Sequence, residues 1–380
     1  MDESTLVAAS RRFPLLSRPR PACPSLVERV QEIAQIAQGT RADETDVLME
    51  ATHALNKAAL LVSDSGLASF ARDLCWQQIN IFRDAGPALS VSEVGYMLAP
   101  VLNLARLSIR SGGGNEAIDL LENMLQAVKH RSDLEIDGHT LPITKMAGTR
   151  EEHRKLYEWA WKVCIADGVR ALVVQARWDE AVRHAERHRG IGLHLMEGRQ
   201  AAIVADCLNG CADTATRLFE ASILTEKWEL QVATCLNVMC SYAAGKPVSA
   251  EVAAMVGAFQ DQQSTPGYAP YYARLGLSVA TLAAGLYPEE ANRALSRAAS
   301  EALKSADGYA SREIAGFKSA VIHLEVQDRK ALNDQVSSSG LGAGRLPGAL
   351  FDSLVVSVDI AEAALKARCA RVQRSWALHS

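Results

Sequence analysis

The chain has 380 residues, of which 48% are hydrophobic, 22% charged and only 6% aromatic. This length exceeds what one small hydrophobic core needs, so we expect two domains or one elongated array. A formal net charge of -4 excludes a globally basic surface, and phosphates require a basic face. We therefore expect no nucleic-acid partner.

The N-terminal residues 1–24 mix prolines and arginines, which predicts a flexible arm, and they lack the apolar run of a signal peptide. Nothing later approaches the roughly 18 uninterrupted apolar residues of a membrane span. The eight cysteines are scattered without a CxxC pair, as buried thiols in a reducing compartment would be. These features predict a cytoplasmic protein that does not bind membranes.

One short pattern recurs between about residues 45 and 325: a small residue followed five positions later by alanine, with helical periodicity on both sides. The pattern ends at Ala71, Ala117, Ala181, Ala215 and Ala250 and, with one extra residue, at Ala291. Two successive intervals, of 34 and 35 residues, match the roughly 34-residue period of a helix–turn–helix repeat. We expect the small residue to end one helix in a left-handed conformation and the alanine to let the next helix pack closely. The expected caps of the second helices are Asn115, Asp179, Asp213 and Ser249.

The segment "ARWDEAV", residues 176–182, has an aromatic residue two positions after the small residue and an alanine three positions further on. It resembles the turn of the tetratricopeptide repeat. The other turns depart from that pattern, with Ala68, Gly114, Ala212 or Pro247 in the aromatic place. The resemblance implies an all-α, tetratricopeptide-like helical-repeat array with a concave groove that binds a ligand.

A β-hairpin is predicted to interrupt this array, because apolar and polar residues alternate around Asp137-Gly138, a strong two-residue turn signal. Thr149 and Glu152 then form the capping box of a long helix. A glycine- and serine-rich stretch near residue 340 predicts a loop before the last helix. The expected order is an arm (1–24), the array (25–330) with its small β-hairpin insertion (133–148), a loop (331–348) and a C-terminal capping helix (349–380).

His184 and His188 lie four residues apart in "HAERH" and so share one face of a helix. The zinc-protease motif places its glutamate directly after the first histidine, whereas Glu186 comes one residue later and points away. No third ligand follows at metal-site spacing. We therefore interpret the pair as part of a solvated helix face and expect neither a metal nor a cofactor.

A stripe of His153, Tyr157, Trp161 and Cys164 is predicted on one face of the helix that follows the hairpin. The hairpin itself carries Asp137 and His139. Together these side chains predict a lidded pocket with aromatic walls, suited to a medium-sized organic ligand. The alternative is that the aromatic side chains only fill the interface where the hairpin docks.

Two functions fit this sequence. The first is a regulatory or accessory binding protein that holds a peptide, a protein or a hydrophobic small molecule in its concave groove. The second is a cofactor-independent enzyme of specialised metabolism, of the dehydratase, cyclase or isomerase type. The predicted acid–base residues of such an enzyme are Asp137, His139, His153 and Tyr157, and the predicted ligand-binding residues are Trp161, His194 and Arg199. The alanine-rich, lysine-poor composition is typical of actinobacteria, and formation of a homo-oligomer is left open.

Overall fold

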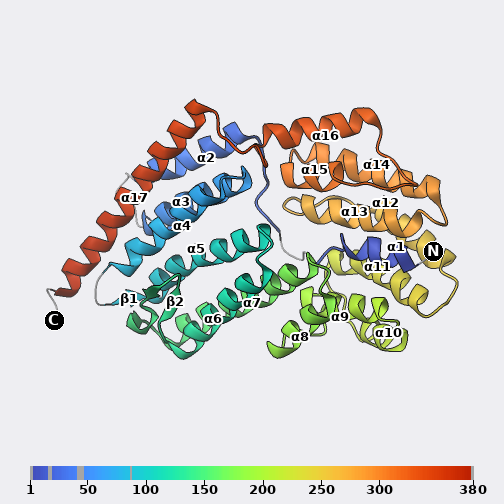
Figure 1. The fold of residues 1–380 in the computed structure, drawn as a ribbon, viewed down its shortest axis with the longest axis horizontal. Helices are drawn as coiled ribbons and strands as arrows, with labels where there is room; N and C mark the ends of the chain where they lie inside the picture. Colours follow the sequence, from blue (N-terminus) through green and yellow to red (C-terminus); the bar gives the residue numbers. More distant parts are fainter. Residues whose placement is uncertain (1–2, 16–18, 41–46, 86–87, 378–380) are drawn as a thin grey trace. The chain divides into compact units, whose positions relative to one another are not determined.

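The computed structural model describes residues 3–15, 19–40, 47–85 and 88–377. Within these residues the chain forms seventeen α-helices and only short strands, which confirms the all-α class (Figure 1). The chain divides into two compact units with interleaved segments. Unit 1 comprises Met1–Ser25 and Leu172–Ser339, and unit 2 comprises Leu26–Ala171 and Gly340–Ser380.

Unit 2 is a series of helices in which each of the first four helices packs against the helix that follows it. Its helices are α2 (Leu26–Gly39), α3 (Val47–Asp64), α4 (Ala68–Arg83), α5 (Val91–Arg110), α6 (Gly114–His130), most of α7 (Arg150–Val173) and α17 (Gly348–Ala377). The C-terminal helix α17 returns to pack against α2 and α3. It does so through Leu354, Val358, Ala361 and Leu365, which recur at helical spacing and are buried.

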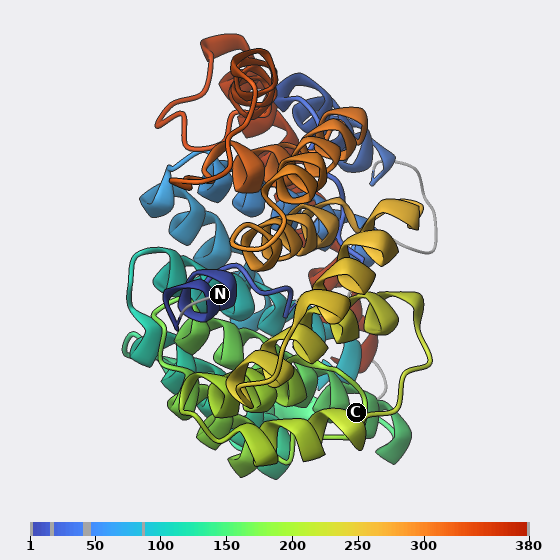
Figure 2. The ribbon, with the colours of Figure 1, turned by 90° about the vertical axis from the view of Figure 1, so that its right-hand side faces the viewer.

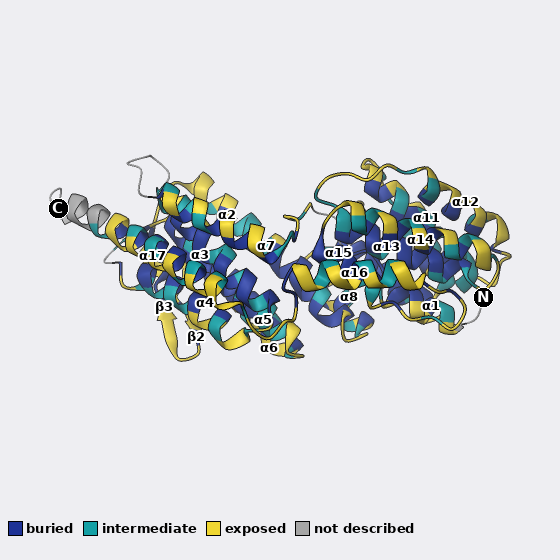
Figure 3. Ribbon diagram, turned by 90° about the horizontal axis from the view of Figure 1, so that it is seen from above, coloured by how far each residue is buried: buried dark blue, intermediate teal, exposed yellow. Residues whose placement is uncertain are grey.

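Unit 1 follows the same principle of consecutive packed helices. Its helices are α1 (Glu3–Ser10), α8 (Trp178–Arg187), α9 (Glu197–Leu208), α10 (Ala212–Glu220), α11 (Lys227–Ala243), α12 (Ser249–Asp261), α13 (Ala269–Ala283), α14 (Pro288–Lys304), α15 (Gly308–Ala315) and α16 (Val326–Ser338). Figure 2 shows the yellow and orange helices of this unit following one another in space. In α2 of unit 2, buried and exposed residues alternate around the helix, as the hydrophobic pattern of a surface helix requires, whereas α16 is mainly exposed or intermediate (Figure 3).

Two boundaries of the predicted domain order need correction. The expected arm contains α1, which packs against α13 and α9, and Phe13 behind it is fully buried. The first half of the expected loop 331–348 belongs to α16, whose Leu332 is buried. One buried leucine on an otherwise polar helix gives too weak a periodicity to see in the sequence. Residues 1–2, 16–18 and 378–380 of the predicted segments lie outside the described residues.

The predicted hairpin is present as β2 (Leu134–Ile136) and β3 (His139–Leu141), paired antiparallel. Asp137 and Gly138 both have positive φ, 52° and 76°, as a type I′ turn requires. The capping box is also confirmed: Glu152 N donates to Thr149 Oγ1 at 3.2 Å and Thr149 N donates to the Glu152 carboxylate at 2.7 Å. A second pairing, not expected from the sequence, joins β1 (Leu89–Ser90) and β4 (Met146–Ala147) in parallel; a short 3-10 helix (Ile143–Lys145) precedes β4.

Five of the six repeated turns have the left-handed residue that the pattern predicts; Gly285, in the turn before Ala291, is not left-handed, so the prediction is wrong there. In four of the five, the residue with positive φ lies two residues before the first residue of the next helix: Gly66, Gly112, Ala176 and Gly210. The alanines five positions after them, Ala71, Ala117, Ala181 and Ala215, are fully buried. Each left-handed residue therefore sets the rotation of the next helix, so that its alanine meets a neighbouring helix.

The fifth turn departs from this pattern. Gly245 is left-handed, but α12 begins four residues later, at Ser249. The two additional residues rotate the helix, so Ala250 is exposed and Val252 takes the buried place. The expected close contact at Ala250 is therefore wrong, whereas Ala291 is buried as expected.

The predicted N-caps are also wrong. The capping positions of α6, α8, α10 and α12 are Gly113, Arg177, Cys211 and Val248, without a side-chain capping bond. Ser249 is the first residue of α12. Asn115, Asp179 and Asp213 fall inside the first turn of helices that start two residues after the left-handed residue. There the carboxylates of Asp179 and Asp213 still interact favourably with the helix dipole.

The left-handed turn at Ala176 leads to a test of stability. We expect Ala176→Gly to stabilise the protein by about 1 kcal/mol, because glycine has no Cβ penalty at φ 58°. We expect the matched change Gly210→Ala to destabilise it by about the same amount. A Cβ at Gly210 meets nothing within 4 Å, so the substitution changes only the conformational energy of the left-handed backbone. Urea denaturation measures the free energy of unfolding of both variants. Equal stability of the two variants and the original protein would contradict the left-handed conformation at these turns.

Candidate functional site

The side chains of the predicted pocket in unit 2 contact different elements of that unit. Asp137 forms an ion pair with Arg72, and the ring of His139 contacts Trp76 edge-on at 4.9 Å between centroids. Arg72 and Trp76 lie four residues apart on α4 and share one face. The hairpin therefore docks on α4 through the two residues that were expected to face a ligand.

The α7 stripe contacts other elements of unit 2. His153 is half-buried and its Nε2 lies 2.8 Å from the carbonyl oxygen of Val128 on α6. Tyr157 and Trp161 are half-buried and pack against the hydrophobic core of the unit. The lidded pocket over this stripe stays a prediction, and the described contacts give these residues structural partners.

The other two predicted residues, His194 and Arg199, lie together in unit 1. They belong to the segment that joins α8 to α9 and to the first turn of α9. This segment is not helical, yet several side chains fix its backbone. Gln200 is fully buried; its Nε2 donates to Leu195 O at 2.6 Å and its Oε1 accepts from Leu15 N at 2.8 Å.

Arg199 fixes the same segment by hydrogen bonds from its guanidinium. Its side chain is buried, and burial lowers the pKa of its guanidinium. It donates to Gly192 O at 2.6 Å, to Leu218 O at 2.5 Å and to Ser222 Oγ at 2.8 Å. These bonds join the segment to the end of α10, so Arg199 acts as a positioning residue.

Gly198 lets the start of α9 approach the same segment. A Cβ at this position would lie 2.5 Å from the carbonyl oxygen of Gly190 and 3.1 Å from the Cβ of Ala185. Real Cβ atoms do not approach a carbonyl oxygen so closely, so only glycine fits here. Gly198 therefore has a packing role, whereas a Cβ at Gly192 would meet nothing within 4 Å.

Glu229, in the first turn of α11, is the central polar group of this region. Its side chain is 1% exposed. One carboxylate oxygen accepts from Leu195 N at 3.0 Å and lies 3.2 Å from Nδ1 of His194. The other accepts from Thr225 N at 2.9 Å, Thr225 Oγ1 at 3.1 Å and Glu226 N at 3.0 Å. Both oxygens therefore act as hydrogen-bond acceptors.

These bonds determine the charge of Glu229. Burial raises its pKa, but the hydrogen bonds from Glu226, Thr225 and Leu195 together outweigh burial, and the pKa lies below the ordinary value. The group is therefore a carboxylate at neutral pH. Because a carboxylate only accepts, the hydrogen between it and His194 is on Nδ1, and in the ring that carries this single hydrogen the outer nitrogen Nε2 has a lone pair.

Four exposed apolar side chains lie on the segments that carry or adjoin His194. Leu193 is 53% exposed, Met196 37%, Ile223 45% and Leu230 54%. The backbone brings Leu193 and Ile223 together beside His194, because Ile223 N donates to Leu193 O at 2.9 Å and His194 pairs with Ile223 in a short parallel bridge. Met196 lies two residues after His194 in the chain. Leu230 directly follows Glu229. We call His194 with Leu193, Met196, Ile223 and Leu230 the His194 surface.

The His194 surface combines an oriented imidazole, 49% exposed, with apolar side chains on a fixed backbone. Such an arrangement can bind an apolar group and accept one hydrogen bond beside it. Sequence reasoning identified His194 and Arg199 but missed Glu229, which is 35 residues from His194. A glutamate at the start of a helix is an ordinary pattern, and no spacing rule joins it to the histidine.

No protein-family model, curated protein or solved structure matches this chain.

Among the described residues, no helix has both the length and the apolar character needed to cross a membrane.

The role of the Glu229 carboxylate can be tested by measuring how protein stability depends on pH. We expect Glu229→Gln to destabilise the protein by about 1–3 kcal/mol at pH 7, because an amide leaves buried N–H donors poorly paired. The pKa of Glu229 is depressed on folding, so its contribution is present above the ordinary glutamate value of 4.5 and is lost as the pH falls below it.

Urea denaturation between pH 7 and pH 3 measures this difference. The variant should lose less stability than the original protein as the pH falls through this range. Glu220→Gln, at an exposed glutamate at the end of α10, is the control and should match the original. Parallel pH curves for Glu229→Gln and the original protein would refute the assigned role.

Proposed function

We propose that the chain is a helical binding protein, and that the His194 surface holds the apolar part of a peptide ligand. The observation that carries this proposal is a set of four exposed apolar side chains on the segments that meet at an imidazole paired with a buried carboxylate. Single exposed apolar residues are common on proteins, but grouped ones indicate a contact surface. The tetratricopeptide-like array and its concave groove belong to the same proposal.

The chemistry of the surface favours a peptide. An extended peptide offers apolar side chains and backbone N–H donors at short, regular intervals. Leu193 and Ile223 can contact an apolar side chain, while Nε2 of His194 accepts from an N–H beside it. Because Arg199, Gln200 and Glu229 fix the backbone beforehand, little conformational entropy is lost on binding.

A cofactor-independent enzyme is the second candidate. The pairing of His194 with Glu229 favours it, because a carboxylate that holds an imidazole in one tautomer is a common arrangement of a general base. The predicted acid–base residues Asp137, His139, His153 and Tyr157 belong to unit 2 and do not take part in this pair. Binding therefore ranks first.

The peptide proposal is tested with a random peptide library displayed on phage and selected on the immobilised full chain. For enriched peptides we expect Leu230→Ser and His194→Ala each to weaken binding about tenfold or more, which is about 1.4 kcal/mol. Both side chains are exposed, so the fold should persist. Fluorescence polarisation with the synthetic peptides measures affinity.

The control is Val326→Ser on α16, which removes an apolar side chain that is 82% exposed. It should leave the affinity unchanged. Peptides that bind the original protein and all three variants equally would contradict a ligand site at the His194 surface. Peptides that lose affinity only with Val326→Ser would move the site to α16.

A further inference from the structure

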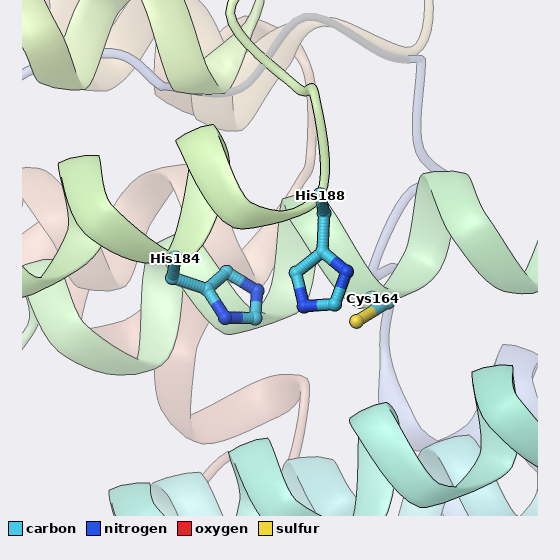
Figure 4. A group of neighbouring side chains, drawn as sticks. All are labelled: Cys164, His184 and His188. Atoms are coloured by element: carbon cyan, nitrogen blue, oxygen red, sulfur yellow. The ribbon is translucent and has the colours of Figure 1, made fainter.

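The two histidines of α8 occupy the last turn of a short helix. His184 is 2% exposed and His188, the C-terminal capping residue, is half-buried. Their ring centroids lie 4.8 Å apart, with the ring planes at 58°. Figure 4 shows the two rings pointing toward one another from neighbouring turns of the helix. The interpretation of this pair as a solvated helix face is therefore wrong for His184.

This geometry is that of a chelating pair. Side chains at i and i+4 lie on one face of a helix, so two imidazoles there can direct one nitrogen each to a common point. Imidazole is a preferred ligand of Zn²⁺, Ni²⁺ and Cu²⁺, with Zn–N distances of about 2.0–2.1 Å. We propose that His184 and His188 bind one divalent transition-metal ion of this class, with Zn²⁺ as the first ion to test.

The partial burial of the pair supports this proposal. Burial removes bulk water from one side of the ion and fixes the ring of His184, so less side-chain entropy is lost on binding. The neighbouring Arg183 and Arg187 add positive charge, which opposes any cation held only by charge. Coordination by neutral nitrogen, as with Zn²⁺, tolerates such neighbours better than ionic binding of Mg²⁺ or Ca²⁺ does.

An ion at this pair would also act on the next segment. His188 is followed by Arg189, which is left-handed with φ 53°, and then by the segment that carries His194. An ion that joins two turns of α8 would stabilise the end of this ten-residue helix, which is short for a helix. The proposal does not depend on what the His194 surface binds.

The experiment uses the full chain, treated with a chelator and then titrated with Zn²⁺ by calorimetry under reducing conditions. We expect one saturable site and a melting temperature that rises with Zn²⁺ and falls again on adding chelator. His188→Gln and His184→Asn should each weaken binding at least tenfold. His323→Ala, at an exposed histidine elsewhere in unit 1, is the control and should bind as the original does.

A cysteine variant distinguishes Zn²⁺ binding by the two histidines from Zn²⁺ binding by a cysteine thiol. Figure 4 additionally labels Cys164, a buried cysteine of α7. If Cys164→Ser removes Zn²⁺ binding while both histidine variants keep it, the proposal is overturned. It is also overturned if Zn²⁺ fails to saturate any site on the original chain. Because His188 is half-buried, His188→Gln tests the ligand role even if His184→Asn unfolds; circular dichroism identifies that case.

Discussion

The carboxylate of Glu229 is the interaction on which the candidate binding surface depends. It is almost fully buried, and it accepts hydrogen bonds from the segment before α9 and from the backbone before α11. Without these donors a buried charge at this place would be strongly unfavourable. Because the donors come from two separate stretches of chain, the same group that is stabilised by them also joins those stretches. The orientation of His194 is a consequence of that joining.

Arg199 is the buried cation of the same region, and it also fixes the segment before α9 by hydrogen bonds. Its guanidinium donates to two backbone carbonyls and a hydroxyl, in a place where helix α10 ends and its carbonyl groups lack helical partners. A cation at a helix C-terminus is favourable, and burial strengthens each bond. The surface around His194 is thus held by one buried anion and one buried cation, each satisfied mainly by backbone groups.

Local sequence signals predicted several local structures, although the four predicted N-caps were wrong. Asp137-Gly138 predicted the hairpin, and Thr149 with Glu152 predicted a helix start, because these features depend on neighbouring residues alone. The glycines and Ala176 predicted left-handed turns for the same reason. Ala250 could not be placed correctly, since a turn two residues longer looks nearly the same in sequence but rotates the helix that follows. The His194–Glu229 pair could not be predicted from the sequence, because the two residues meet only after α9, α10 and α11 have packed.

Gly198 shows how a residue that contacts no ligand can govern a binding surface. Its missing side chain makes room for the Gly190 carbonyl, and the backbone between these two glycines carries His194. Any larger residue at position 198 would push that stretch outward and shift the imidazole away from its carboxylate. If the His194 surface binds a peptide as proposed, a search for variants that lose this binding would find position 198 among its strongest results, although a map of direct contacts would leave it out.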